Sequence, residues 1–168
     1  MSEVAIRRAK RDDRDGAVRL WRRLQADHEA QDPRYRMSHD AEARWLTDFR
    51  SWTRAHSSRV WVADARGELV GLLTAHLAEP APVYEGEPFV FVGDLVTAPA
   101  WRGRGVGRLL LGAAREWGRE VGAAEIRAGV LAANPAGRRF WEREGAEDFS
   151  VTVVVPLDRA GGPADTGG

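Results

Sequence analysis

A glycine- and arginine-rich stretch, RGRGVG at residues 102–107, constrains the fold more than any other feature of this sequence. Before it, the run FVFVGDLVT at 89–97 is almost continuously apolar, which is typical of a central strand buried on both faces, and Pro99 ends that run. After it, apolar residues recur at helical spacing from Leu109 to Val121. The sequence therefore predicts a strand, a glycine-rich loop and a helix in direct succession.

This loop is suited to bind an anion at the start of the helix. The N–H groups of a first helical turn have no partner within the helix, and the helix dipole is positive at that end. Glycines let a phosphate approach the backbone closely, and arginines add charged hydrogen bonds to its oxygens. The residues available for this are Arg102, Gly103, Arg104, Gly105, Val106, Gly107 and Arg108.

Two common nucleotide-binding motifs do not fit the loop. The third glycine of the dinucleotide fingerprint G-x-G-x-x-G would fall at Arg108, and no Gly-Lys-Ser/Thr follows as in a Walker A loop. A phosphate-binding module for another nucleotide and a glycine-rich turn with solvated arginines remain as alternatives at this point.

The remaining patterns give the order of the other elements. We expect strands at 4–9, 59–65, 68–79, 124–132 and 149–157, and helices over 17–30, 39–56 and 134–145. Arg66 and Gly67 form a hairpin turn, and Asn134 caps the last helix. This order predicts an α/β fold with helices on both faces of a mixed, largely antiparallel central sheet. We expect one domain over 1–158 and an unfolded glycine-rich tail over 159–168.

Composition excludes several classes of function. The 25 basic residues balance 25 acidic ones, so no overall positive field favours nucleic acid or an anionic membrane. Cysteine is absent, which excludes a disulfide, a thiol nucleophile and a cysteine-ligated metal, and we expect no metal site. The first residues lack the apolar core of a signal peptide and no run is long enough to span a membrane, which predicts a cytoplasmic location.

The stretch VGDLVTAPAWRGRGVGRLLL, followed about thirty residues later by NPAGRRFWEREGA, resembles the acyl-coenzyme A binding core of the GCN5-related N-acetyltransferase (GNAT) family. The family's loop [Arg/Gln]-x-x-Gly-x-[Gly/Ala] is matched by Arg102, Gly105 and Gly107. The two motifs cover residues 89–146, and the element order is similar over 3–157. The resemblance implies an acetyltransferase that moves acetyl from acetyl-coenzyme A to a primary amine by direct attack.

The resemblance also implies how the cofactor arm and the thioester are held. Backbone groups of Leu95, Val96 and Thr97 would bind the pantetheine arm as an added strand. An N–H around Val96 would stabilise the oxyanion of the tetrahedral intermediate. Asn134 would contact the cofactor arm, or cap its helix, or do both.

At the general base and acid this sequence departs from the family's pattern. Relatives often carry Glu-Asp where this chain has Gly93 and Asp94, and Asp94 replaces the missing Glu only if a bulge rotates it. The other candidate bases are His76 and Glu79, whereas His28 on an amphipathic helix is expected to pack. The family's acidic tyrosine is replaced by Trp141, which can line the cofactor but cannot readily protonate a thiolate.

The acceptor remains open from the sequence. A small molecule, a peptide or a protein N-terminus would enter between the link 31–37 and the loop 80–88, where the candidate contacts are Asp32, Arg34, Tyr35, Arg36, Tyr84, Glu85 and Glu87. Because Trp141 and Gly93 stand where catalytic residues are expected, a non-catalytic acyl-coenzyme A sensor is the alternative function. The terminal strand 149–157 could pair between chains to form a homodimer.

Overall fold

The structure, a computed structural model, describes residues 4–157. Five strands and four α-helices follow in this order: β1 (Ala5–Arg8), α1 (Arg14–Gln31), α2 (Ala41–Trp52), β2 (Ser58–Ala65), β3 (Glu68–Ala78), β4 (Phe89–Thr97), α3 (Val106–Glu120), β5 (Glu125–Ala128) and α4 (Pro135–Arg143). Short 3₁₀ turns lie at Arg11–Asp13, Pro33–Tyr35 and Pro99–Trp101.

The strands form one sheet in the order β1-β2-β3-β4-β5. The first four strands pair antiparallel, and β5 pairs parallel to β4. The turn between β2 and β3 is the expected hairpin, because Arg66 has φ 57° and Gly67 has φ 92°, as a two-residue turn of this type requires. The mixed, largely antiparallel sheet predicted from the sequence is confirmed.

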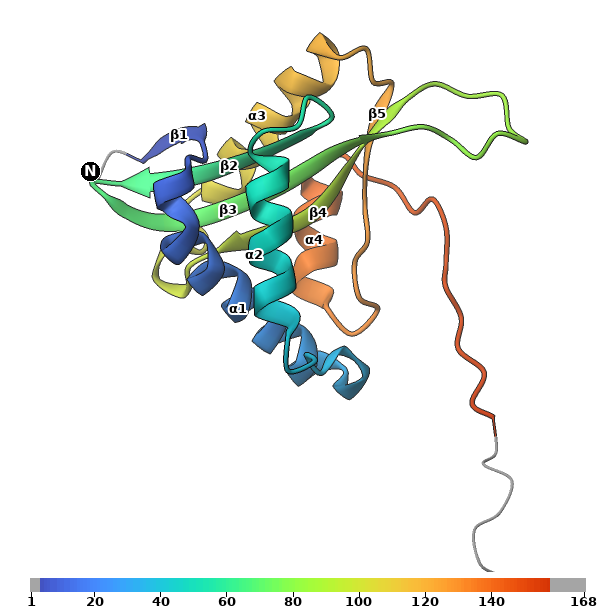
Figure 1. Ribbon diagram of the computed structural model, residues 1–168. Coiled ribbons are helices and arrows are strands. Elements are labelled where there is room, and N and C mark those ends of the chain that lie inside the picture. Colours follow the sequence, from blue (N-terminus) through green and yellow to red (C-terminus); the bar gives the residue numbers. More distant parts are fainter. Residues whose placement is uncertain (1–3, 158–168) are drawn as a thin grey trace, which may run out of the picture.

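Helices cover both faces of the sheet (Figure 1). On one face, α1 and α2 bury Trp21, Trp45 and Phe49 against the strands, and the rings of Trp21 and Trp45 stack with centroids 5.2 Å apart. On the other face, α3 buries Leu110 and Trp117 against β2, β3 and β4. The amphipathic patterns read from the sequence thus give two separate cores, one on each side.

Pairing between β4 and β5 is short, and this opens the sheet. It runs only from Phe89 opposite Glu125 to Val92 opposite Ala128, while β4 continues to Thr97 along β3. The carboxyl half of β4 therefore keeps one edge free of a neighbouring strand.

Three expectations are corrected. Burial along β4 alternates, with Phe91 and Gly93 exposed, because one face of its end lies outside the packed layers. The strand expected at 124–132 is limited to β5, since the chain then turns away from β4. The strand expected at 149–157 is wrong for this structure: the segment is irregular and exposed, and it pairs with no described strand. The tail expected at 159–168 lies outside the described residues.

Candidate functional site

A cleft of about 1020 Å³ opens beside the free edge of β4. Its walls come from α1, the end of β4, the loop before α3, the residues after β5, and α4. It is lined by most of the cofactor-binding residues expected from the sequence: Leu95, Val96, Thr97, Arg102, Gly103, Gly105, Val106, Gly107, Arg108, Asn134 and Trp141. Segments far apart in the chain therefore meet beside the glycine-rich loop, where the sequence predicts an anion-binding site.

The loop before α3 is built around two left-handed glycines. Gly103 has φ 73° and Gly105 has φ 80°, and a Cβ at either would meet no atom within 4 Å, so open space lies beside the backbone. The N–H of Leu109 donates to the carbonyl of Gly105 at 3.0 Å. The N–H groups of the preceding helical residues have no acceptor within the helix. They form a cradle for an anion, defined here as residues 102–108.

The arginines of the cradle differ in their contacts. Arg102 donates to Asp27 of α1 at 2.8 Å and to the carbonyl of Thr97 at 3.3 Å, which holds the loop against α1 and β4. The guanidinium of Arg104 lies 5.3 Å from the Trp101 ring centroid, and this residue does not line the cleft. Arg108 lies on the rim, with Nε 3.9 Å from a carboxylate oxygen of Glu144.

The free edge of β4 presents alternate backbone groups to the cleft. The N–H of Ala98 donates to the carbonyl of Val70 in β3 at 2.8 Å. Because successive N–H groups of a strand point to opposite edges, the N–H of Val96 also faces β3. The N–H groups of Leu95 and Thr97 face the opposite, open edge. The N–H of Val96 itself is therefore directed away from the cleft, and its two neighbours supply the donors there.

The last helix closes the cleft against the cradle. The side chain of Asn134 accepts from the N–H of Gly137 at 2.9 Å, so the residue does cap α4 as the sequence indicates. A Cβ on Gly107 would lie 3.2 Å from Cε2 of Phe140, so a larger residue at 107 would require the Phe140 ring to shift by a few tenths of an ångström. Trp141 packs edge-on against Phe140, with ring centroids 5.4 Å apart.

A β-bulge brings Asp94 onto the face of the sheet that α1 and α2 cover. Thr74 lies opposite Asp94 and Ala75 opposite Val92, so Gly93 is the extra residue of the bulge. A Cβ on Gly93 would lie 3.1 Å from Thr74 Oγ1 and 3.5 Å from His76 Nε2, on the side where Thr74 contacts Asp94. Gly93 and Asp94 therefore face the same side, which is the condition for Asp94 to stand in for the missing Glu.

Asp94 is mostly buried and is held through one carboxylate oxygen. Oδ2 accepts from the indole N–H of Trp45 at 3.2 Å and from the hydroxyl of Thr74 at 2.9 Å. Burial raises the pKa of Asp94 above its usual value, and the two hydrogen bonds oppose that rise. The carboxylate is thus fixed in place yet more basic than an ordinary aspartate. Of the two bulge residues, Gly93 lines the cleft and Asp94 lies just behind it.

The other two candidate bases lie outside the cleft lining. The ring of His76 packs 4.8 Å from that of Trp52, its Nδ1 is 2.9 Å from the hydroxyl of Ser58, and burial lowers its pKa. Glu79 is exposed, one residue beyond the end of β3. The structure instead brings His28 of α1 to the cleft, together with Asp27. The sequence pattern predicts that His28 lies on the buried face of its helix, but the pattern does not show that the cleft opens beside this end of the helix.

None of the acceptor contacts expected from the sequence lines the cleft. Asp32 pairs with Arg34 at 2.6 Å, which lowers the pKa of Asp32, and Glu29 pairs with Arg36 at 3.3 Å. These pairs leave the link between α1 and α2 little net charge. In contrast, Tyr84, Glu85 and Glu87 are exposed on the loop between β3 and β4, which projects beyond the sheet (Figure 1).

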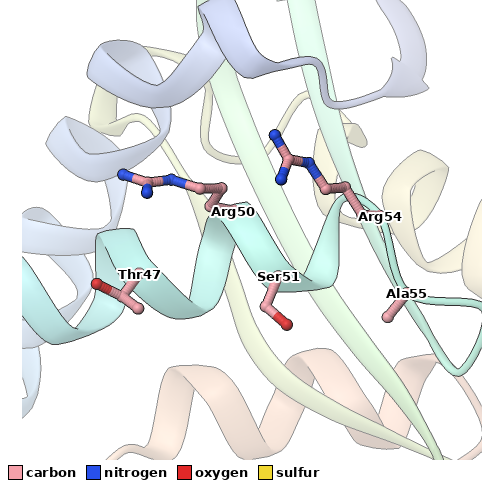
Figure 2. Close-up of a pocket in the computed structure, with 5 residues that line it drawn as sticks. All are labelled: Thr47, Arg50, Ser51, Arg54 and Ala55. Carbon is pink, nitrogen blue, oxygen red and sulfur yellow. The ribbon is translucent and has the colours of Figure 1, made fainter.

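A second hollow, of about 450 Å³, lies along α2 and has a different character. Figure 2 shows its lining, with the side chains of Arg50 and Arg54 on one side of the helix and those of Thr47 and Ser51 on the other, near Ala55. None of the site residues expected from the sequence lines it, and neither does the free strand edge. It does not compete with the cleft as the candidate active site.

Two further properties concern residues 4–157 only. No helix in that range combines the length and apolar character needed to cross a bilayer. The same range contains no cluster of three or more histidine, aspartate or glutamate side chains placed to hold a metal ion.

Solved structures with the same fold include the following three, of which the second and third are named as acetyltransferases. The BH1408 protein of Bacillus halodurans, as a tetramutant, superposes with a TM-score of 0.81 at 24% identity, covering 91% of this chain and 99% of that one. The aminoglycoside N-acetyltransferase AAC(6')-Iy in complex with CoA gives a TM-score of 0.75 at 21% identity, covering 94% and 96%. The aminoglycoside acetyltransferase meta-AAC0020, from an uncultured soil sample and in complex with sisomicin, gives 0.68 at 21% identity, covering 92% and 97%.

A comparison with the curated proteins finds no match. A family model does match: the acetyltransferase (GNAT) family, over residues 11–146. That range includes α1, α2, the free edge of β4, the cradle and α4. The chain therefore belongs to the GNAT family of acetyl-CoA-dependent N-acetyltransferases.

Proposed function

We propose that this enzyme transfers acetyl from acetyl-CoA to a primary amine of a small molecule by direct attack. The observation that carries the proposal is the cradle at the start of α3, which opens into the same cleft as the free edge of β4. An anion site and an unpaired strand edge in one cleft suit a ligand that combines a pyrophosphate with an amide-bearing arm.

The cradle would hold the pyrophosphate of the coenzyme. Backbone N–H groups of Val106, Gly107 and Arg108 supply uncharged donors at the positive end of the helix dipole. Arg102 is already paired with Asp27, so its main contribution is to hold the loop, whereas Arg108 on the rim is free to turn toward a phosphate. Asn134 can contact the arm while its side-chain oxygen caps α4.

The free edge of β4 would bind the arm and polarise the thioester. The N–H groups of Leu95 and Thr97 face the cleft and can donate to acceptors placed alongside the strand. We assign the oxyanion donor to Leu95, the nearer of the two to the bulge. A well-placed donor of this kind lowers a barrier by about 3 kcal/mol.

Asp94 is the proposed proton acceptor. The bulge turns it to the side of Gly93, its raised pKa suits proton transfer, and Trp45 and Thr74 fix its orientation. The missing side chain at Gly93 leaves a path from the cleft, which one water molecule can bridge. The attacking amine then loses its proton by this relay as its nitrogen bonds to the carbonyl carbon.

Collapse of the tetrahedral intermediate breaks the carbon–sulfur bond and releases the CoA thiolate with an amide product. Trp141 stands where the family's tyrosine acid is expected, and its indole N–H is not an acid at neutral pH. A thiolate is a tolerable leaving group, so we propose that it takes its proton from solvent.

The acceptor is proposed to be a small polyamine-like molecule, by similarity to neighbours whose structures contain aminoglycosides or their analogues. The test is release of CoA thiol, measured with acetyl-CoA and a panel of aminoglycosides, diamines and peptides with free N-termini. Turnover with the small amines is expected. Turnover with peptides alone would reject the proposed acceptor class, and binding of acetyl-CoA without turnover on any amine would favour a non-catalytic sensor.

A further inference from the structure

One face of α1 changes from apolar to polar where the helix reaches the cleft. In the first half of the helix this face is buried against the sheet, at Leu20 and Trp21. At helical spacing the same face continues into the cleft, which is lined by Leu24, Asp27, His28 and Gln31. Polar residues at positions where the helical pattern is otherwise apolar indicate a functional role, because packing alone would keep the pattern.

Gln31, the last residue of α1, has an unused hydrogen-bond acceptor. Its side-chain oxygen Oε1 is buried and accepts no hydrogen bond from any residue in the range 4–157. In that range one other buried side-chain polar atom lacks a partner, Nε1 of Trp117, which lies in the core on the α3 side of the sheet and not in the cleft. An unpaired buried acceptor destabilises a fold, so packing does not explain Gln31.

The carboxamide of Gln31 can turn toward a ligand. Within the described chain no hydrogen bond holds its oxygen, and the residue as a whole is only partly buried. Rotation about the last bond of the side chain exchanges the oxygen with the amide nitrogen and turns Oε1 from the interior toward the cleft that the residue lines. The oxygen therefore gains a hydrogen bond from a ligand without losing one within the protein.

Gln31 lies within reach of a molecule bound at the proposed base. His28, one turn earlier in α1, is close enough to Asp94 for its charge to lower the pKa of that carboxyl, against the larger effect of burial. From His28 to Gln31 the helix rises by about 4.5 Å. A small amine with its nitrogen near Asp94 can therefore reach Gln31 with a second polar group a few bonds away.

The surroundings of Gln31 favour a neutral donor over a second ammonium group. The three acidic residues within four positions of it all form ion pairs: Asp27 with Arg102, Glu29 with Arg36, and Asp32 with Arg34. A second ammonium would meet no free carboxylate among them and would have to give up its hydration. A hydroxyl donates to a carboxamide oxygen without that cost.

We infer that Gln31 is a specificity-determining residue whose carboxamide oxygen accepts a hydrogen bond from a hydroxyl group of the acceptor. The enzyme selects amines that carry a hydroxyl a few bonds from the reacting nitrogen. The inference rests on the proposed function, because it concerns the acceptor of that reaction, and it narrows the acceptor class from small amines to amino alcohols.

Three amines of equal length compare the groups that could meet Gln31. Butylamine, 3-amino-1-propanol and 1,3-diaminopropane place a methyl, a hydroxyl and an ammonium group at the same position, and the set is repeated with one carbon fewer and one carbon more. The parent is expected to acetylate the best amino alcohol with a kcat/KM at least about tenfold above that of its matched alkylamine. Preference for the diamine, or no preference for the hydroxyl at any of these lengths, overturns the inference.

Gln31→Met removes the acceptor and keeps the length of the side chain. It is expected to abolish the preference for the hydroxyl while leaving kcat/KM for the alkylamine little changed. Gln25→Met, on another face of α1 and outside the cleft lining, is the matched control and should keep the parent's preference. A Gln31→Met variant that retains the preference contradicts the inference.

Thermal unfolding separates this role from a structural one. Because Gln31→Met removes an unpaired buried oxygen, it should raise Tm by about 2 °C or more. A lower Tm in Gln31→Met than in the parent would instead assign Gln31 to the stability of the fold.

Binding measurements keep the inference distinct from the proposed function. Calorimetric titration of the same amines into the protein in the presence of CoA requires no turnover. Tighter binding of the amino alcohol by the parent than by Gln31→Met supports the inference, and equal binding by the two proteins overturns it. Acetyl-CoA binding without turnover on any amine would count against the proposed function alone.

Discussion

The indole Nε1 of Trp45 donates to Oδ2 of Asp94 across 3.2 Å and joins α2 to the bulge of β4. The ring of Trp45 also stacks on Phe49, with centroids 5.4 Å apart, so the donor is fixed by the core. The buried carboxylate is thus held in one orientation by a rigid partner. A fixed orientation is expected of a general base, which must lie within reach of the proton that it accepts.

Asp94→Asn is expected to lower kcat by about a hundredfold or more, because a positioned proton acceptor contributes about 10²–10⁴-fold. Asparagine keeps the shape and can still accept from Trp45 and Thr74, so KM for acetyl-CoA should change little. Steady-state kinetics measure this, with Asp40→Asn, at the residue just before α2 and away from the cleft, as the control. An Asp94→Asn variant as active as the parent would exclude this residue as the base.

The same variant is expected to be at least as stable as the parent at pH 7. Because burial raises the folded-state pKa of Asp94, its contribution to stability is full below its unfolded pKa and is lost as pH rises through the folded pKa. At neutral pH the charged form therefore disfavours folding, and asparagine removes that effect. Thermal melts at several pH values should show the difference in Tm shrinking toward acid; a variant that is less stable at every pH would contradict the assignment.

The activity of the parent should fall in acid at a pH above the ordinary aspartate pKa of about 3.9. Protonation of Asp94 through its raised pKa removes the acceptor, so kcat falls as pH decreases. Burial is the largest effect on the pKa of Asp94 and raises it, whereas the nearby His76 of β3 and His28 of α1 act in the opposite direction. A pH profile of kcat checks this, and the acid limb should disappear in Asp94→Asn. An identical limb in both proteins would assign it to another group.

Two alanine substitutions in α3 should have different effects. Gly112→Ala meets no atom within 4 Å and should stabilise the helix by up to about 1 kcal/mol. Gly107→Ala places a Cβ 3.2 Å from the Phe140 ring and should give a smaller gain or none, while weakening acetyl-CoA binding because the ring beside the cleft must shift. Chemical denaturation and calorimetry on both variants measure the contrast. Equal gains in stability with unchanged affinity would show that α4 does not need the close approach.

Arg7 ties β1 to the turn before α1 and to β2, and its loss should destabilise the fold. It donates to Asp13 at 2.8 Å, which lowers the pKa of Asp13, and to Asp64 at 2.9 Å. The pKa of Asp64 is lowered by the hydrogen bond from the N–H of Gly67 and then by that from Arg7. Arg7→Gln should reduce the free energy of unfolding by about 1–3 kcal/mol. The contribution is present above the carboxylates' unfolded pKa and is lost as pH falls through their folded values, so the deficit should vanish in strong acid. Arg14→Gln, at an exposed pair, should change stability by less than about 1 kcal/mol.

Much of the fold could be predicted because turn residues, helix caps and hydrophobic periodicity specify the same elements that the packed structure contains. The hairpin at Arg66 and Gly67, the cap at Asn134 and the strand 89–97 each follow from turn chemistry or periodicity. The glycine loop and the family motif likewise placed the cradle. The segment 149–157 has the alternation of a strand, but it pairs with no described strand, and an unpaired segment is not stable as a strand.

The chemistry around Asp94 could not be predicted from the sequence. Whether Asp94 faces the side of Gly93 depends on one extra residue in the register between β3 and β4, and periodicity does not reveal such a bulge. The direction of the Val96 N–H depends on the same register. His28 lines the cleft because of the way α1 packs over β4, and local sequence patterns do not predict the packing of one element on another.

Calorimetric titration with acetyl-CoA shows whether the cradle binds the coenzyme. Gly105→Glu puts a carboxylate in the cradle, and Gly112→Glu makes the same change on α3 at a site without contacts within 4 Å. Gly105→Ala carries the same backbone strain without the charge. We expect micromolar binding by the parent and Gly112→Glu, a modest loss in Gly105→Ala, and at least a tenfold loss in Gly105→Glu, about 1.4 kcal/mol. Parent-like affinity in a folded Gly105→Glu variant, or no binding by the parent, would contradict the account.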